Sequence, residues 1–510
     1  MGTPARRWTF FLLLGLAALA HLTAIRSGGF IMDDDDSVTQ NAALRSAEGL
    51  RDIWLRVGPR AGGTVQYYPL TYTVFWFEHA LWGDRPAGYH VVNVLLHALN
   101  AVLVYWILSG LGVPGALLGA ALFAVHPVHA ESVAWVTELK NVLSGAFYLL
   151  SLLCFLRGRK YRALSVVLFG AALASKSATA TLPAAILLIL WWKNGRATRR
   201  DFVSVAPMAA MGLGAGLLTS WVERTQVGAS GAEWSLLFSQ RIMIAGRALW
   251  FYAGKLLWPA DLMFIYPRWE IGGGVSDWLY PLSAVAALAG LWGLRKKIGR
   301  GPAAAGLYFA GTLLPALGFF DFYFMRYSFV ADHFQYLASL GPLALFAAGF
   351  SRARIRGGTA AAAALAALLA GLTWRQERIY ASPQSLWSDT VWRNPACWLA
   401  RHNLGEALLR QGNPDAAVDQ FRELLRLRPD LEDARSDAAL AINSLGVARA
   451  RAGLPGEAIE LFREALRLRP GFADASDNVG LAERQVREPA LIAPAGPTPA
   501  AAVDPVPPQP

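Results

Sequence analysis

Long apolar segments separated by short polar stretches fill most of the first 375 residues. About eleven of these segments approach the length of a transmembrane helix. They are residues 8–25, 88–108, 111–126, 139–156, 162–176, 178–193, 202–221, 277–294, 302–320, 335–350 and 358–373. Because only a helix satisfies its own backbone hydrogen bonds inside lipid, the pattern predicts an all-α, polytopic membrane bundle.

Basic residues cluster at the ends of these segments and set the predicted topology. The clusters are residues 6–7, 157–162, 193–200, 295–300 and 352–356. Since Lys and Arg mark cytoplasmic loops, the N-terminus is predicted to be cytoplasmic and the region after residue 375 extracytoplasmic. A further apolar stretch, residues 242–258, would invert this pattern if it crossed. It is predicted to be a re-entrant or interfacial helix on the outer side, with its cations facing lipid headgroups.

Composition supports a membrane protein and excludes several other classes. The 510 residues are 55% hydrophobic and 16% charged, with 19 Trp, which a soluble globule cannot accommodate. The formal charge of +11 does not indicate nucleic-acid binding, because the basic residues occupy segment ends. Two distant cysteines, Cys154 and Cys397, suggest no disulfide framework.

Residues 395–487 follow a different pattern, typical of tetratricopeptide repeats. Small residues recur where two helices would cross, as at Gly405 and again at Gly446. The prolines that end the two copies, Pro429 and Pro470, are 41 residues apart instead of 34. The excess is predicted to extend a helix through residues 431–439.

The pattern divides the chain into four parts. Residues 1–375 form the membrane domain, and residues 376–394 form a linker helix. Residues 395–487 hold two repeats and a capping helix, a short α-solenoid. Residues 488–510 are almost entirely Pro, Ala and Val and are predicted to be disordered.

Candidate chemistry gathers in the loops that the topology places outside and in a polar stripe on the second predicted span. The candidate residues are Asp33, Asp34, Tyr68, His90, Asn93, His126, His129, Glu131, Glu138, Lys140, Lys176, Arg326, Asp332 and His333. A lipid-linked sugar keeps its phosphate at headgroup level, where cations can stabilise a leaving phosphate and a carboxylate can accept a proton. Lys176 at a span end needs an anion, which we expect to be that phosphate, with Asp332 or Glu131 as the alternative.

Other interpretations remain open for some of these residues. His126, His129 and Glu131 are candidate metal ligands, but their spacing is not a standard zinc pattern and Pro127 interrupts it. No metal ligand is assigned, and use of a divalent cation is left open. The stripe from His90 through Asn93 can equally hold helices together. Transport is disfavoured because the span centres lack Asp, Glu, Lys and Arg.

Six motifs, in order and spacing, resemble a known family. They are Asp33-Asp34 with Asn41, Tyr68-Pro69-Leu70, Tyr89 to Asn93 with His97, His126 to Trp135, Lys176 before Leu182-Pro183, and Ala331 to Tyr336. Together they resemble the bacterial relatives of the transmembrane-and-tetratricopeptide O-mannosyltransferases. That family belongs to the GT-C class of polytopic glycosyltransferases, and the likeness runs from residue 1 to about 485.

The resemblance implies an activity and a place in the cell. It implies transfer of a sugar, mannose being one candidate, from a polyprenyl-phosphate donor to an extracytoplasmic acceptor, with Ser or Thr of a protein expected. The setting would be the bacterial inner membrane, with inversion at the anomeric carbon. Partners would be membrane lipid and a protein bound by the repeats, without nucleic acid. The alternative is a non-catalytic, membrane-anchored repeat scaffold for envelope assembly.

The resemblance also implies residue roles. In the family an acid of the first outer loop is the base, which here is Asp33 or Asp34. His333 stands where the family often has Arg, and a neutral imidazole binds phosphate less well than a guanidinium. Arg326 is the alternative cation for that role.

Overall fold

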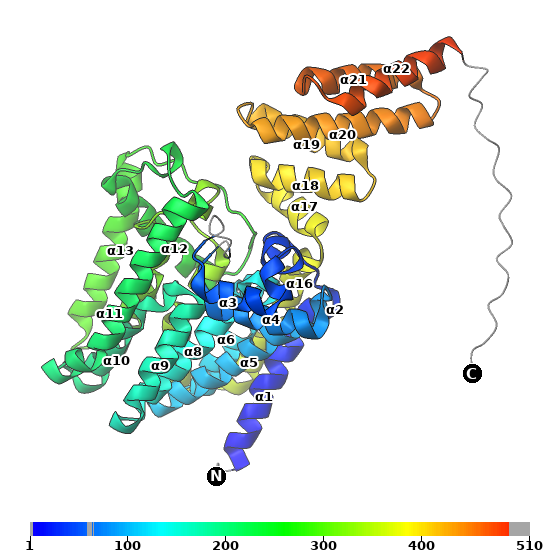
Figure 1. The fold of residues 1–510 in the computed structure, drawn as a ribbon. Helices are drawn as coiled ribbons and strands as arrows, with labels where there is room; N and C mark the ends of the chain where they lie inside the picture. Colours follow the sequence, from blue (N-terminus) through cyan, green and yellow to red (C-terminus); the bar gives the residue numbers. More distant parts are fainter. Residues whose placement is uncertain (1–3, 59–63, 65, 489–510) are drawn as a thin grey trace, which may run out of the picture. The chain divides into compact units, whose positions relative to one another are not determined.

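The computed structural model describes residues 4–58, 64 and 66–488, with side chains from residue 8 onward. These residues form helices and loops without a β-strand. They divide into two compact units, residues 1–397 and 398–510. Each unit is drawn in Figure 1 and is described by itself below.

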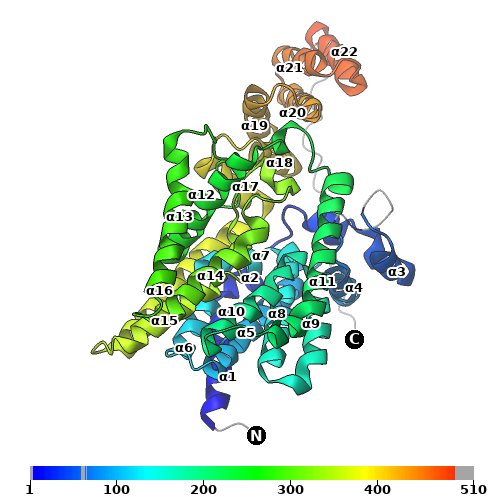
Figure 2. The ribbon, with the colours of Figure 1, turned by 90° about the vertical axis from the view of Figure 1, so that its left-hand side faces the viewer.

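Each predicted apolar segment overlaps a helix of the first unit, and these helices form a bundle (Figures 1 and 2). The helices are α1 (Pro4–Ala20), α5 (Pro86–Gly110), α6 (Ala116–Val125), α8 (Leu139–Leu156), α9 (Arg162–Ser175), α10 (Leu182–Asn194), α11 (Arg199–Val222), α13 (Val275–Leu294), α14 (Gly301–Leu313), α15 (Leu340–Arg352) and α16 (Gly358–Glu377).

The helices differ in length and in apolar character, and not all of them are long enough to span a membrane. Among the described residues, 4 helices are long and apolar enough to cross a membrane, or up to 5 if a bent pair counts as one span. They lie at Pro86–Gly110, Val136–Leu156, Arg199–Val227 and Gly358–Ala381. The chain is therefore a helical membrane protein, and the count of eleven spans stays a prediction.

The polar stripe on α5 lies inside the bundle. Asn93 Nδ2 donates to the carbonyl of Trp135 at 3.1 Å, and Asn100 Nδ2 donates to that of Val142 at 2.8 Å. His97 Nδ1 lies 2.8 Å from the hydroxyl of Tyr336. These side chains are fully buried and bond to neighbouring segments, so helix–helix contact accounts for most of the stripe.

A break after α6 delivers acidic residues to one end of the bundle. Proline lacks an N–H and clashes with the preceding turn, so α6 ends before Pro127. The chain bends by 52° there. Three short helices follow, η4 (Pro127–His129), α7 (Ala130–Ala134) and η5 (Val136–Glu138), before α8 begins. This segment holds Glu131 outside the long helices and places Glu138 near the start of the candidate span Val136–Leu156.

Further short elements surround the same end of the bundle. They are α2 (Leu22–Ser27), η1 (Asp35–Thr39), η2 (Ala42–Arg45), α3 (Ala47–Leu55), α4 (Pro69–Trp82), η7 (Ser177–Thr181), η11 (Tyr323–Arg326) and η12 (Asp332–Gln335). Figure 1 shows α3 and α4 beyond the ends of α5 and α8, away from the N-terminus. The first loop and the segment from α6 to α8 therefore lie close together.

The stretch predicted to be interfacial forms α12 (Phe238–Leu257), which is not among the described helices long and apolar enough to cross a membrane. Its cations have protein partners. Arg241 Nη2 lies 2.7 Å from Asp321 Oδ1, and the Arg247 guanidinium lies 4.5 Å from the Trp269 ring. Lys255 Nζ donates to the carbonyl of Ala260 at 2.7 Å. Protein groups therefore partner these cations, and their placement at lipid headgroups stays a prediction.

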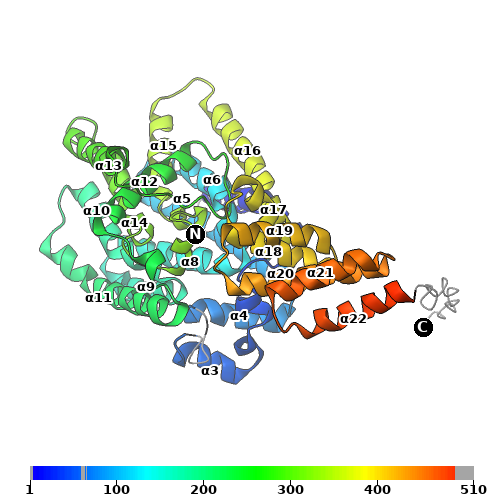
Figure 3. The same cartoon turned by 90° about the horizontal axis from the view of Figure 1, so that it is seen from above.

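The second unit is a run of antiparallel helices, visible in Figures 1 and 3. They are α18 (Trp398–Arg410), α19 (Pro414–Leu427), α20 (Glu432–Arg451), α21 (Pro455–Leu468) and α22 (Ala473–Arg487). A Cβ at Gly405 would lie 2.7 Å from the Phe421 ring, and one at Gly446 would lie 2.5 Å from the Phe462 ring. The same close approach thus recurs in both repeats.

The structure bears on three predicted features of this region: the helix extension, the linker helix and the tail. The helix α20 begins at Glu432 and so includes most of the excess residues between the two repeats. The linker region contains α17 (Pro383–Arg393). The tail predicted to be disordered lies outside the described residues, except for Glu488.

Candidate active site

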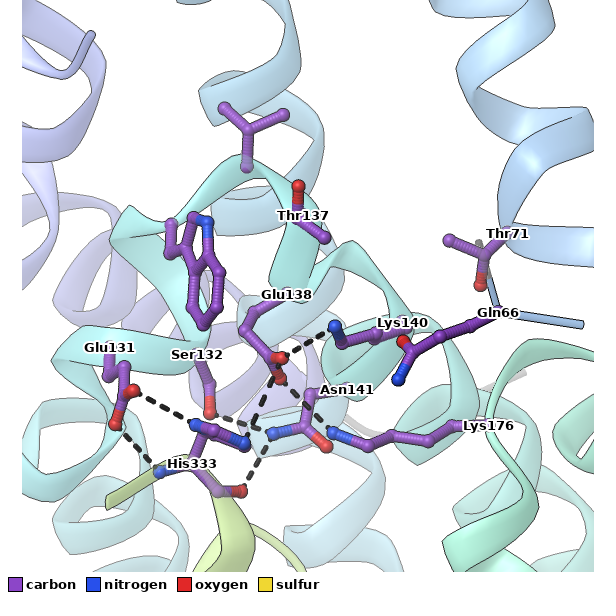
Figure 4. A network of polar contacts seen from close by, with 12 residues as sticks. Gln66, Thr71, Glu131, Ser132, Thr137, Glu138, Lys140, Asn141, Lys176 and His333 are labelled. Carbon is purple, nitrogen blue, oxygen red and sulfur yellow. Dashed lines mark hydrogen bonds and ion pairs between the residues drawn. The ribbon is translucent and has the colours of Figure 1, made fainter. Parts of the chain in front are cut away.

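A buried carboxylate, that of Glu138, is the centre of a polar cluster at the loop end of the bundle (Figure 4). Its Oε1 lies 3.2 Å from Lys140 Nζ, and its Oε2 lies 3.2 Å from Lys176 Nζ. The contact with Lys176 is a hydrogen bond, whereas the contact with Lys140 is an ion pair without hydrogen-bond geometry. Two ammonium groups therefore share one carboxylate.

The partner of Lys176 is an acid of the segment before α8. As the alternative to the donor phosphate we expected a loop acid such as Asp332 or Glu131. The structure pairs Lys176 with a different acid of this kind, Glu138.

Glu131 and His333 form the other half of the cluster. Glu131 Oε1 lies 2.9 Å from His333 Nδ1, and Glu131 Oε2 accepts the backbone N–H of His333 at 3.0 Å. His333 Nε2 lies 4.0 Å from Glu138 Oε1. Asn141 Nδ2 donates to the His333 carbonyl at 2.7 Å. The cluster thus ties α7, α8 and η12 together.

Helix ends explain where the two lysines stand. Lys176 directly follows the last residue of α9, where the free carbonyls of the helix attract a cation. Lys140 occupies the first turn of α8, where the helix dipole disfavours a cation. The neighbouring Glu138 carboxylate offsets that repulsion, and the Lys140 ammonium lies 5.4 Å from the Trp135 ring.

Asp34 is fully buried and anchors the first loop. Its Oδ2 accepts the N–H of Ile31 at 2.8 Å, and its Oδ1 accepts the N–H of Thr137 at 2.8 Å and the Thr137 hydroxyl. Burial raises the pKa of Asp34 to about 7, although these hydrogen bonds favour the charged form. Its oxygens are therefore engaged in holding the loop against η5.

Asp33 differs from its neighbour. Its side chain is half-buried, and its carboxylate accepts no hydrogen bond from the residues that the structure describes. Burial raises the pKa of Asp33, the positive charge of Lys140 opposes that rise, and Asp36 and Glu138 add to it. Asp33 is thus a carboxylate with spare acceptor capacity, close enough to Lys140 for the two charges to interact.

Three other predicted residues surround the cluster at different depths. Tyr68 is buried, and burial raises its pKa to about 12 in the fields of Glu223 and Lys140. Arg326 Nε lies 3.1 Å from Glu233 Oε2, outside the cluster. Asp332 accepts the Tyr266 hydroxyl at 3.0 Å on both oxygens, so its carboxylate is engaged away from Lys176.

The remaining predicted residues lie inside the bundle and not in the cluster. His126 Nε2 donates to the Leu256 carbonyl at 3.1 Å, and His129 Nδ1 donates to the Phe123 carbonyl at 2.8 Å. Asn93 bonds to backbone carbonyls, and His90 is buried within α5. Their side chains lie apart from the Glu138 cluster, and their contact with substrate stays a prediction.

The metal alternative for His126, His129 and Glu131 finds no geometric support. Within the described part of the chain, these side chains do not gather at metal-ligand distances. The Glu131 carboxylate is occupied by His333, and both histidines donate to carbonyls.

Three residues of the cluster, Thr137, Asn141 and Ser132, were not among the predicted ones. Thr137 anchors Asp34, and Asn141 joins Ser132 Oγ at 3.0 Å to the His333 carbonyl. Asn141 follows Glu138 by three residues, the spacing that puts two side chains on one helix face. This three-residue spacing from Glu138 is the sequence signal by which Asn141 could have been found.

Comparison with known protein families identifies the second unit. A family model described as tetratricopeptide repeat matches residues 350–432 and 402–472. The pattern of small and large residues in this region therefore corresponds to a recognised repeat.

Comparison with curated proteins identifies relatives of this chain. A Caenorhabditis elegans protein, protein O-mannosyl-transferase F38B6.6, is 26% identical over 440 residues, which cover 82% of this chain and 63% of that protein. Human protein O-mannosyl-transferase TMTC4 is 35% identical over 163 residues, covering 28% of this chain and 22% of the relative. The chain thus spans less than two thirds of the length of these relatives. It is a homologue of proteins named protein O-mannosyl-transferases, and it carries tetratricopeptide repeats.

Proposed function

We propose that this protein is an integral membrane glycosyltransferase of the GT-C class. It takes a sugar, with mannose the first candidate, from a polyprenyl-phosphate donor and transfers it to Ser or Thr of an extracytoplasmic protein. The observation that carries the proposal is the sharing of Glu138 by Lys140 and Lys176 beside Asp33. The names of the relatives support the same reaction class.

In this proposal the two lysines bind the donor phosphate. With both ammonium groups charged, their pair with Glu138 carries a surplus positive charge. An incoming phosphate would receive charge-assisted hydrogen bonds from the ammonium groups, which are stronger than neutral ones. Lys140 contacts Glu138 as an ion pair and Lys176 contacts it through a hydrogen bond.

In this proposal Asp33 is the general base that accepts the proton of the acceptor hydroxyl. The acceptor hydroxyl gives its proton to the Asp33 carboxylate while its oxygen bonds to the anomeric carbon. The bond from that carbon to the donor phosphate oxygen breaks, and the electron pair leaves with the phosphate. Lys140 and Lys176 neutralise the charge that develops there. A single displacement of this kind inverts the anomeric configuration.

Glu131 and His333 have a positioning role in this scheme. The paired contacts of Glu131 fix the imidazole and backbone of His333 beside Glu138. Asn141 fixes the same segment from α8. The repeats supply a surface for a protein partner, and the bacterial inner membrane with extracytoplasmic repeats is the proposed setting.

The donor class can be tested by binding. We expect a polyprenyl-phosphate sugar, added to purified protein in detergent, to raise its melting temperature in a saturable way, because a bound ligand stabilises the folded state. A nucleotide sugar should have no effect at equal concentration, and polyprenol without phosphate serves as the control for lipid alone. Stabilisation by the nucleotide sugar and not by the lipid-linked sugar would contradict the proposed donor.

A further inference from the structure

A compact group of metal-ligand side chains lies in the repeat unit, apart from the candidate active site. It consists of His402 and Glu406 on α18 and Asp437 on α20. One ligand atom from each residue lies within 4.8 Å of the other two, and His402 Nε2 lies 2.8 Å from Asp437 Oδ2. No other group of three such side chains meets this distance among the described residues.

The local sequence explains how the three side chains meet. His402 and Glu406 are four residues apart, so they share one face of α18. Asp437 belongs to the early part of α20, which contains the excess residues between the two repeats. If the second repeat had the standard 34 residues and ended at Pro470, its first helix would begin after Asp437. The extension of α20 thus supplies the third ligand.

Three carboxylates act on the His402 imidazole. Asp437 Oδ2 lies 2.8 Å from His402 Nε2, and Glu406 and Asp433 are close enough for their charges to act on the same ring. Arg410 Nη2 lies 3.9 Å from Glu406 Oε2. A cation at this position would therefore interact with several negative charges.

We propose that His402, Glu406 and Asp437 bind a divalent transition-metal cation of the zinc class. One imidazole nitrogen and two carboxylate oxygens are ligands that zinc accepts, and three protein ligands leave a position for water. The imidazole disfavours Mg²⁺ and Ca²⁺, which prefer oxygen ligands throughout. Binding requires neutral His402, so the ion replaces the proton that His402 shares with Asp437.

The bound ion would act as a cross-link within the solenoid. It would add a metal link between α18 of the first repeat and α20 of the second, which the His402–Asp437 contact already joins. Because repeat proteins are stabilised by contacts between neighbouring repeats, this link would stiffen the unit. The inference does not depend on the proposed transferase activity, and its test measures no sugar transfer.

The test is a metal titration of the full-length protein in detergent, purified through a tag without histidine and freed of metal by a chelator. We expect calorimetry with Zn²⁺ to show binding of about one ion per chain, with proton release, and the melting temperature of the protein to rise. Glu406→Gln and Asp437→Asn should each weaken zinc binding by at least about 10-fold. Glu406 has a 38% exposed side chain, so its amide variant should fold normally.

The matched control is His79→Gln. It removes a different imidazole–carboxylate pair, His79 Nε2 to Asp84 Oδ1 at 3.7 Å, which has no third ligand among the described residues. Zinc binding should be unchanged in this variant. Absence of zinc binding to the wild type, equal binding by Glu406→Gln, or equal affinity for Ca²⁺ would each overturn the proposal.

Discussion

Replacing Asp33 with Asn should lower the rate of sugar transfer by about 10²–10⁴-fold, since that is the usual cost of losing a positioned base. The variant should remain folded, because the Asp33 carboxylate accepts no hydrogen bond from the described residues. Transfer is measured with labelled donor and acceptor, and folding by the melting temperature. Asp36→Asn, in the same acidic run, is the control and should have a mild effect.

Asp34→Asn should behave differently. An amide cannot accept all the hydrogen bonds that Ile31 and Thr137 donate to the Asp34 carboxylate, so the main expected effect is a lower melting temperature. A normal transfer rate in Asp33→Asn, together with a folded but inactive Asp34→Asn, would assign the base to Asp34 instead.

The pH dependence follows from the same carboxyl group. A general base must be ionised, so kcat/KM should fall as the pH decreases through the pKa of Asp33. Because burial raises that pKa above the ordinary value of 3.8, the fall should begin at a higher pH than for an exposed aspartate. The residual rate of Asp33→Asn should lack this step.

Lys176→Met should weaken use of the lipid donor, with kcat/KM falling about 10- to 100-fold, because one charge-assisted contact to phosphate is lost. A rise in KM would show a contact made in the bound donor, and a fall in kcat would show one made mainly in the transition state. Lys140→Met should have an effect of similar size. Lys255→Met, which removes an ammonium bound to backbone carbonyls elsewhere, is the control.

The competing interpretation is that Lys176 only stabilises Glu138. Removing one of the two cations that share the buried Glu138 carboxylate weakens the compensation of its charge and should lower stability. A Lys176→Met variant with a reduced melting temperature and normal donor kinetics would therefore remove Lys176 from the site.

The helices of the membrane unit were predictable because apolar runs are a local property of the sequence. Each predicted segment overlaps a helix, although fewer helices meet the full length of a span. The pairing in the candidate site was not predictable, because Lys176 and Glu138 are brought together by the packing of α9 against α8. The sequence placed acids and cations at one end of the bundle but did not identify Glu138 as their centre.

His126 and His129 show that residue type alone does not predict the structural role of a side chain. The end of α6 leaves backbone carbonyls without intrahelical donors, and the break at Pro127 turns the following residues inward. His129 satisfies the carbonyl of Phe123 in that last turn. His126 donates to the end of α12, which lies far away in the sequence. Both imidazoles thus complete helix ends, a role that depends on tertiary structure.

The central claim is sugar transfer from a polyprenyl-phosphate donor. The direct measurement uses purified protein in liposomes, polyprenyl-phosphate mannose radiolabelled in the sugar, and an extract of extracytoplasmic proteins. The account predicts that label moves to protein, is released by base treatment as expected for a Ser or Thr linkage, and depends on Asp33. Folded protein that transfers no label from polyprenyl-phosphate mannose or any other polyprenyl-phosphate sugar would contradict the account and favour a membrane-anchored repeat scaffold.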